Sequence, residues 1–508
     1  MLAKSESSGL IGLNGFRVCI EADVSGGVPS YELVGLPDAA VKESRERVKA
    51  AIKNSSLNYP GGRIIINLAP ADLKKEGSVY DLPIAAALLA ASMQIPADEL
   101  SDTALLGELA LDGSIRPVRG ALPMVIDLMR RGMKRVILSD KNALEAAYID
   151  GIDVLAAKNL TQVVRHFLRA DRISPAPTAA FKAEESGETL FENDFAFIKG
   201  QEGAKRAVEI AVAGGHNILF IGPPGSGKSM IAKAVPTIMP TFSLEESLEA
   251  SKIHSVAGML KNGILTKRPF RSPHHTSSTV ALTGGAKGPG EISLAHTGVL
   301  FLDELPEFKR EALEALRQPL EDGRVTISRA GFKQDFPAQF TLIASMNPCP
   351  CGYYGDRSGK CRCSQFQIRN YLSRISGPFL NRLDVMWEVS RPEFSELRST
   401  AHEESSAQIK KRVDAARDIQ RRRYAGTKIY CNAQLTGELL ERYCALDARA
   451  EGLLRMAFNS MSMSARAYKR ILCVARTIAD LQGSENITEK HVAEAIQYRA
   501  LDRKYWGD

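Results

Sequence analysis

The chain has 508 residues, of which 44% are hydrophobic and 25% are charged, a balance that is ordinary for globular proteins and excludes a disordered or fibrous class. This length exceeds what one hydrophobic core usually organises, so two or three domains are expected. The formal net charge of +7 favours a polyanionic partner without identifying one.

The sequence shows no targeting or membrane segment. Its first residues lack the basic start and apolar core of a secretory signal. The most apolar stretch, residues 82–93, is shorter than the roughly 20 residues that a membrane span needs. We therefore expect a cytoplasmic protein without a membrane partner. Half of the eight cysteines crowd into residues 349–363, which indicates reduced thiols and a candidate metal site rather than a disulfide framework.

The first 170 residues alternate between strand-like and helix-like segments. Apolar residues recur at helical spacing in residues 38–53 and fill a buried helix at 82–91. Short apolar runs predict strands at residues 16–21, 31–34, 63–68, 134–138 and 152–155. The alternation predicts an α/β domain over residues 1–170, followed by a linker at 171–193 in which proline, serine and charged residues mix.

A glycine-rich stretch dominates the next domain, which begins near Asp194. Residues 222–229 fit the phosphate-loop pattern G-x-x-x-x-G-K-[ST] between an apolar run and a helical segment. The glycines allow backbone N–H groups and a helix N-terminus to converge on phosphates, while Lys228 reaches the outer phosphates and Ser229 faces Mg²⁺. The predicted ATP-binding residues are Gly222, Pro223, Pro224, Gly225, Ser226, Gly227, Lys228 and Ser229.

Two carboxylates follow a later apolar strand at residues 297–302. Charges at the carboxyl end of a buried parallel strand reach the ligand crevice of the sheet. Asp303 would then hold Mg²⁺ through water, and Glu304 would orient and polarise the attacking water. The alternative is a surface strand end that carries two solvated acids.

Four cysteines enclose a polar loop just after another apolar strand at residues 340–346. Four thiolates are the ligand set of a structural zinc site, and a loop without its own core gains most from such a clip. The C-x-C spacing is less usual than C-x-x-C, so reduced cysteines without a metal are the alternative. The four are Cys349, Cys351, Cys361 and Cys363.

Three histidines offer a weaker metal signal. His274 and His275 are adjacent, and His296 lies further along the chain. Adjacent side chains point differently on any regular element. We expect all three to be hydrogen-bonded structural or nucleotide-coupled residues.

After about residue 391 the strand signals end and the pattern becomes helical. Ser464 is the expected N-cap of the fourth helix, and Gly483 ends it. The predicted helices are residues 393–422, 434–446, 448–458, 465–481 and 488–501.

Several stretches resemble the magnesium-chelatase-like AAA+ ATPases of bacteria, of the YifB and ComM type. They are RPFRSPHH at 268–275, GGAKGPGE at 284–291, LRQPLEDG at 316–323 and NPCPCG at 347–352, and the resemblance extends over nearly the whole chain. It implies an AAA+ P-loop α/β core with a parallel sheet at 194–390, a C-terminal α-helical lid at 391–508, ATP and Mg²⁺ as cofactors, and a hexameric homo-oligomer.

The resemblance also implies roles for single residues. Asn347, at the end of its strand, takes the sensor 1 position, from which an amide can bond the lytic water or the γ-phosphate. Arg382 takes the position of an arginine finger that acts on a neighbouring subunit's ATP, with Arg374 as the reserve candidate. An ion pair between Arg382 and Asp384 is the alternative. Arg466 fits sensor 2 of the lid and would touch the γ-phosphate.

A hairpin signal precedes the Asn347 strand. Residues 325–328 and 332–336 flank Arg329-Ala330-Gly331. In related ring ATPases a hairpin there projects into the central pore, where Arg329 and Lys333 would contact DNA phosphates. An exposed turn with solvated charges is the alternative. A second basic stretch, at 410–412 and 421–423, suits a solvated helix face equally well.

The first domain resembles the Lon protease domain through residues 74–81, 107–109 and 113–121. In that comparison Val79 or Tyr80 fills the place of the nucleophile, and Leu122 fills the place of the lysine base. Ser78 is the only nearby hydroxyl, and a nucleophile without a positioned base is not activated. We expect a Lon-protease-like α/β domain that serves as a scaffold or a surface for protein partners.

Two functions follow from these patterns. The ComM-type resemblance implies a DNA helicase that drives branch migration while transforming DNA is integrated, and the hairpin and the basic balance also favour a DNA motor. The alternative is a chaperone-like remodeller of a protein or of a metal-chelatase-type complex.

Overall fold

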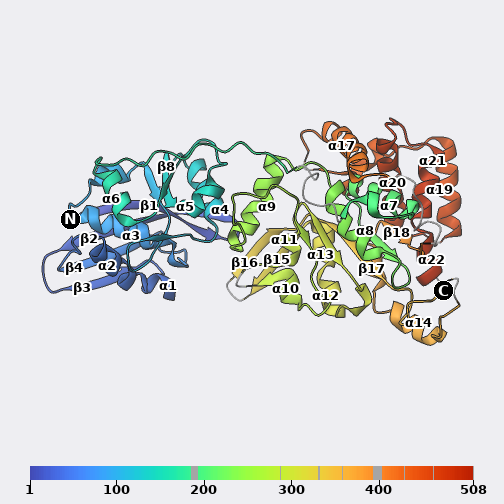
Figure 1. The fold of residues 1–508 in the computed structure, drawn as a ribbon, viewed down its shortest axis with the longest axis horizontal. Coiled ribbons are helices and arrows are strands. Elements are labelled where there is room, and N and C mark those ends of the chain that lie inside the picture. Colours follow the sequence, from blue (N-terminus) through green and yellow to red (C-terminus); the bar gives the residue numbers. More distant parts are fainter. Residues whose placement is uncertain are drawn as a thin grey trace. The chain divides into compact units, whose positions relative to one another are not determined.

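The computed structural model describes residues 1–184, 193–285, 288–329, 332–356, 359–392, 403–427, 429–461 and 463–506. The chain forms two compact units (Figure 1). The first comprises Met1–Lys182 and Leu244–Thr266, and the second comprises Ala183–Ser243 and Lys267–Asp508. The chain therefore passes between the units at 182/183, at 243/244 and at 266/267. Residues 244–266, which the sequence places within the ATPase core, belong to the N-terminal unit instead.

A seven-stranded mixed sheet forms the base of the N-terminal unit, in the order β3-β4-β2-β1-β5-β8-β9. Its longest strands, β1 (Leu2–Ile11) and β2 (Asn14–Ser25), are antiparallel neighbours. The other strands are β3 (Ser30–Val34), β4 (Arg63–Ala69), β5 (Thr103–Leu105), β8 (Arg135–Ser139) and β9 (Asp153–Ala157).

Helices cover both faces of this sheet. Ser5 Oγ of β1 donates to the carbonyl of Pro83 in α3 (Asp81–Ala91) at 2.9 Å. Ser8 Oγ of the same strand donates to Asp127 in α4 (Ala121–Arg130) at 3.3 Å. Because residues 5 and 8 point to opposite sides of a strand, α3 and α4 lie on opposite faces, which confirms the α/β class. The other α-helices and strands are α1 (Ala39–Lys42), α2 (Ser44–Asn54), β6 (Glu108–Leu109), β7 (Ile115–Arg116), α5 (Asp140–Ala146) and α6 (Leu160–Phe167), and two 3-10 helices are η1 (Ser78–Tyr80) and η2 (Ala97–Leu100).

The segment 244–266 is anchored in the same unit. It forms α9 (Leu244–Val256), which packs on α4. The carbonyl of Ser255 accepts the N–H of Gly120 at 2.9 Å, and its Oγ accepts the N–H of Leu122 at 3.4 Å. Ile264, which is 4% exposed, lies in the N-terminal core.

The second unit contains a parallel sheet of five strands in the order β11-β14-β17-β10-β18. The three central strands are fully buried, as the continuous apolar runs predict. The sheet confirms the P-loop α/β class and places the carboxyl ends of its strands at one edge. The strands are β10 (Ile218–Ile221), β11 (Phe270–Arg271), β14 (Val299–Leu302), β17 (Thr341–Met346) and β18 (Val385–Glu388).

Helices and short strands lie along the chain before, between and after the strands of this sheet. The helices are α7 (Glu202–Gly214), α8 (Lys228–Ala234), α10 (Thr279–Thr283), α11 (Glu291–Leu294), α12 (Arg310–Ala315), α13 (Arg317–Asp322), α14 (Gln365–Leu372) and α15 (Gly377–Leu380). Two hairpins accompany them, made of β12 (Gly284–Gly285) with β13 (Gly288–Pro289) and of β15 (Arg324–Arg329) with β16 (Phe332–Pro337).

The C-terminal region is helical, as expected, and packs on α7. Thr477 in α20 bonds His216, just after α7, at 2.7 Å, and Gln420 in α17 donates to the carbonyl of Ala213 at 3.0 Å. Part of the first predicted helix, residues 393–402, lies outside the described residues, and the predicted helix 488–501 is two helices. The helices are α17 (Ser406–Arg423), α18 (Gly437–Tyr443), α19 (Ala448–Ser460), α20 (Ala465–Leu481), α21 (Glu489–Gln497) and α22 (Ala500–Trp506).

Among the described residues, every helix is too short or too polar to cross a lipid bilayer.

Candidate functional site

The glycine-rich loop joins β10 to α8, so all eight predicted phosphate-loop residues lie at the carboxyl edge of the parallel sheet. Gly225 and Gly227 have φ values of 75° and 92°, a left-handed conformation that glycine adopts without strain. A Cβ on Gly222 would lie 2.2 Å from the carbonyl oxygen of Val389. The loop therefore requires glycine for its shape as well as for access to a ligand.

Lys228 is buried beside the loop. Its Nζ donates to the carbonyls of Gly222 at 2.7 Å and Pro223 at 2.9 Å, and it lies 3.3 Å from Oδ1 of Asn347. Burial lowers the pKa of Lys228 to about 8, although the negative charge of Asp303 opposes the shift. Two neutral carbonyls and an amide are weak partners for an ammonium group, so a phosphate would compete well for it.

Asp303 is held next to the loop from three sides. Ser229 Oγ donates to its Oδ2 at 2.7 Å, Ser345 donates to its Oδ1, and the backbone N–H of Glu304 donates to Oδ1 at 3.0 Å. A hydroxyl and a carboxylate oxygen side by side form a ligand set that suits Mg²⁺, which takes few protein ligands and keeps its remaining positions for water and phosphate. The structure brings together Ser229 and Asp303, to which the sequence assigned Mg²⁺, and adds Ser345, to which the sequence gave no role. The Mg²⁺ assignment stays a prediction.

Glu304 leaves the strand in a different direction. Its backbone is left-handed, with φ 54°, and its side chain is 56% exposed. The Nδ1 atom of His275 lies 3.3 Å from its Oε2. The rings of His275 and His274 are tilted by 35° with their centres 4.1 Å apart, and His275 meets Phe308 edge-on. The geometry agrees with a nucleotide-coupled histidine, but the sequence did not indicate Glu304 as its partner.

Arg382 and Arg466 share one carboxylate. The side chain of Arg382 is 7% exposed, and its guanidinium is ion-paired with Oε2 of Glu321. Arg466, which is 60% exposed, lies 3.3 Å from Oε1 of the same residue. Asp384, the alternative partner for Arg382, pairs with Arg470 instead. The structure therefore brings together two arginines to which the sequence assigned separate roles, and those roles stay predictions.

The reserve candidate, Arg374, is more accessible. Its side chain is 51% exposed, and its guanidinium lies 3.1 Å from Glu307 and 5.6 Å from the ring centre of Tyr371. An exposed ion pair of this kind contributes little to stability. Arg374 could therefore change partner at small cost.

The four cysteines of residues 349–363 converge on one point. All are free thiols, and their sulfur atoms lie within 4.8 Å of one another. The distances from Cys349 to Cys351, from Cys349 to Cys361 and from Cys351 to Cys361 are 3.4, 3.8 and 3.7 Å. A tetrahedral ion with bonds of about 2.3 Å to sulfur separates its ligands by about 3.8 Å. The residues therefore fit one ion such as zinc.

The predicted hairpin is present as β15 and β16, with Arg329 opposite Phe332 and Ser328 opposite Lys333. The side chains of Arg329 and Lys333 lie outside the described part of the structure, so their contacts with DNA stay predictions. In the second basic stretch, Arg412 is paired with Glu209 and Glu404. These internal pairs favour a structural role for that stretch.

Ser78 in the N-terminal unit has a carboxylate partner. Its Oγ donates to Glu108, which also lies 3.2 Å from Arg116. The buried lysine of the same region, Lys75, donates to the carbonyl of Leu73 at 2.7 Å. Leu122 is fully buried. The expectation that this domain is non-catalytic stays a prediction.

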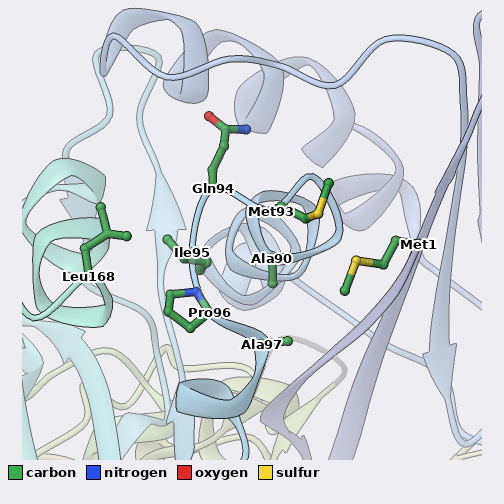
Figure 2. A pocket seen from close by; sticks show the side chains of 8 residues that line it. All are labelled: Met1, Ala90, Met93, Gln94, Ile95, Pro96, Ala97 and Leu168. Carbon is green, nitrogen blue, oxygen red and sulfur yellow. The ribbon is translucent and has the colours of Figure 1, made fainter.

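The same unit carries a hollow of about 310 Å³ (Figure 2). None of its lining side chains is titratable, so the hollow offers no group for acid–base or nucleophilic chemistry. The lining residues are Met1, Ala90, Met93, Gln94, Ile95, Pro96, Ala97 and Leu168.

Known families and proteins match this chain over most of its length. The family described as magnesium chelatase, subunit ChlI, matches residues 194–397, subunit ChlI of Mg-chelatase matches residues 20–142, and the ChlI C-terminal family matches residues 403–499. YifB of Escherichia coli strain K12 is 44% identical over 497 residues, which are 97% of this chain and 96% of YifB. Competence protein ComM of Haemophilus influenzae is 44% identical over 512 residues, or 99% of this chain and 98% of ComM. DNA replication licensing factor Mcm6 of Anopheles gambiae is 22% identical over 408 residues, or 73% of this chain and 46% of that protein.

Proposed function

We propose that this chain, which belongs to the magnesium chelatase subunit ChlI family of AAA+ proteins in its YifB and ComM branch, is an ATP-hydrolysing ring motor that acts on DNA. The observation that carries the proposal is the convergence of Lys228, Ser229, Asp303 and Asn347 at the edge of one parallel sheet, with Glu304 exposed beside them.

Each residue at this edge has a task in ATP hydrolysis. Lys228 would exchange its carbonyl partners for the outer phosphates, and Ser229 and Asp303 would hold Mg²⁺, which neutralises phosphate charge when it is bound. Glu304 would orient the attacking water, because its carboxylate reaches solvent instead of joining the Asp303 network. Asn347, next to Lys228, would sense the terminal phosphate.

Hydrolysis would be completed by a neighbouring copy in a homo-oligomeric ring, most simply a hexamer. Because Arg382 and Arg466 meet at Glu321, we propose that both reach the same neighbouring nucleotide. A guanidinium stays charged and can bridge two phosphate oxygens as negative charge develops. Binding to phosphate would require both arginines to leave Glu321.

Three observations support DNA as the cargo. In the β15–β16 pair, Arg329 is the last residue of β15 and Lys333 is the second residue of β16. The chain has a net charge of +7. Two of its relatives bear names tied to competence and to DNA replication. The finer proposal is a branch-migration helicase or translocase that works in recombination or natural transformation.

ATP turnover and strand unwinding on duplex, single-stranded and branched DNA test this proposal, with Glu304→Gln as the hydrolysis-defective control. We expect DNA to stimulate turnover and Lys333→Ala to reduce that stimulation, because a sequence-independent grip depends on phosphate contacts. Arg324→Ala removes the same charge at the other end of the hairpin, opposite Pro337, and should retain the stimulation.

Failure of every DNA to change turnover would contradict the DNA proposal. Recovery of a stable protein partner, combined with turnover that responds to that partner, would identify a remodeller instead. The ATPase proposal itself would be contradicted if the wild-type chain bound no nucleotide.

The four-cysteine cluster adds a third cofactor to ATP and Mg²⁺. We propose that it holds one structural Zn²⁺ ion, since its sulfur spacing matches a single tetrahedral ion.

A further inference from the structure

The cysteine loop is an extension of the strand that carries the nucleotide sensor. Strand β17 ends at Met346, Asn347 follows it, and Cys349 comes two residues later. The loop ends at Ser364, which caps the N-terminus of α14. The loop is therefore joined through Pro348 to Asn347, whose side chain lies 3.3 Å from Nζ of Lys228.

The cysteine loop also contacts the phosphate loop. Gly352 has φ 84°, and a Cβ on it would lie 2.5 Å from Cδ of Pro224. The backbone of the cysteine loop therefore touches the phosphate loop at a point where only glycine fits. Arg391 makes a second link, because it donates to the carbonyl of Pro224 at 3.2 Å and lies 5.2 Å from the ring centre of Tyr353.

The far side of the loop rests on the C-terminal helix. Tyr354 meets Tyr505 of α22 edge-on, with ring centres 6.4 Å apart. Tyr505 donates its hydroxyl to Glu388 at the end of β18, at 2.9 Å. The loop is thus packed between the phosphate loop and the last helix, and its four thiols lie close together.

The sulfur spacing selects a single ion over an iron–sulfur cluster. A cluster places several irons and sulfides between its thiolates, and sulfur atoms only 3.4–3.8 Å apart leave no room for them. Four thiolates around one point favour Zn²⁺ among the common ions.

We propose that one thiolate-bound zinc ion braces the phosphate loop through the contact between Gly352 and Pro224, so that ATP binds tightly only when the zinc site is filled. The ion does not touch the nucleotide. It acts by holding the cysteine loop in the shape that supports Pro224 on one side and positions Asn347 on the other. The inference rests on the proposed ATP site and assigns it a dependence on a second metal.

Two measurements on the full chain test the proposal: zinc content per chain, and affinity for a fluorescent ATP analogue with Mg²⁺. We expect about one zinc per chain. Removing it with a zinc-selective chelator should weaken nucleotide binding by at least about tenfold, and returning zinc should restore it. Cys361→Ser should behave like the zinc-stripped chain, whereas Cys19→Ser, in the N-terminal unit, should not.

Gly352→Ala distinguishes the effect of the contact between Gly352 and Pro224 from the effect of zinc binding. The added methyl group meets Pro224, so this variant should keep its zinc and still lose nucleotide affinity. Gly359→Ala is the matched control, because Gly359 lies in the same loop with φ 63° and has nothing within 4 Å of its would-be Cβ. It should keep both zinc and nucleotide affinity.

Less than half an equivalent of zinc in metal-replete preparations would overturn the proposal. So would a zinc-stripped chain, or a zinc-loaded Gly352→Ala chain, that binds nucleotide within twofold of the wild type. A zinc-loaded wild type that binds no nucleotide would instead refute the proposed ATPase and remove the premise of the brace.

Discussion

Lys228 is a charged residue in an environment that disfavours charge. It is buried among carbonyls and an amide, without a direct carboxylate partner in the described structure, and its pKa is lowered to about 8. Below pH 8 the side chain carries its proton with or without ligand. Between pH 8 and its ordinary pKa of 10.5, the unliganded site holds the neutral amine.

Nucleotide binding should therefore take up protons at alkaline pH. Phosphate charge favours the ammonium form and raises its pKa again. We expect an uptake of about half a proton at pH 8 that grows towards pH 9 and vanishes near pH 7, where the phosphate, with a pKa of about 6, is already ionised. Calorimetric titration in buffers of different ionisation enthalpy measures this uptake. A value of zero at pH 9 would show that Lys228 is already protonated in the free protein.

We expect His275 to act on hydrolysis through Glu304, because its Nδ1 lies 3.3 Å from Oε2 of that residue. His275→Ala should lower turnover by about tenfold, or about 1.4 kcal/mol of activation free energy, because the partly exposed contact that orients the Glu304 carboxylate is lost. Affinity for the ATP analogue should stay near that of the wild type, because the contact is with Glu304 rather than the phosphate loop. His275→Asn keeps a donor and should recover part of the turnover. An equal loss of affinity and turnover would indicate a structural role instead.

At the scale of elements, α9 belongs to a different unit from the elements that precede and follow it along the chain. It follows the helix of the phosphate loop along the chain, yet it packs on α4 of the other unit, where Ser255 binds the start of that helix. Both ends of the segment return to the ATPase unit. Changes near the phosphate loop therefore have a covalent route to the N-terminal unit.

The position of residues 244–266 in the N-terminal unit predicts which unit a mutation in this segment destabilises. Ile264→Ala should destabilise the N-terminal unit by about 2–5 kcal/mol, because it empties a buried site in that core. Hydrogen exchange of the full chain should then rise in residues 121–130 and remain unchanged in residues 465–481. Ile238→Ala is the matched control, since Ile238 lies in the other core and should give the reverse pattern. Faster exchange in residues 465–481 alone after Ile264→Ala would place the segment in the ATPase unit.

At the scale of the whole molecule, one chain holds the phosphate loop and the acids but keeps its two candidate trans-acting arginines bound to Glu321. The proposed ring would supply each site with arginines from the next copy, through a head-to-tail interface that closes on itself. Such an arrangement would couple hydrolysis to assembly.

Mixing two inactive variants tests this arrangement. Lys228→Ala removes nucleotide binding, and Arg382→Ala removes the arginine supplied to the neighbour. In a random 1:1 mixture about a quarter of the interfaces pair an intact Lys228 with an intact Arg382. ATP turnover should therefore reappear on mixing, after a thermal melt has shown that both variants are folded. No recovery at any ratio would mean that Arg382 serves its own subunit or only the fold.

The sequence by itself determined the features that depend on neighbouring residues. The phosphate loop, the buried strands before Asp303 and Asn347, the hairpin and the C-terminal helices follow from local spacing, because backbone conformation and hydrophobic periodicity are read over a few residues. The class of each domain followed from the order of these elements.

Only the tertiary structure decided which distant residues meet. Four such features have no signature along the chain. They are the position of residues 244–266 in the N-terminal unit, the pairing of His275 with Glu304, the sharing of Glu321 by two arginines, and the contact of Gly352 with Pro224. Each depends on how whole elements pack, and packing is selected by the summed burial and shape of many side chains rather than by any local run of residues.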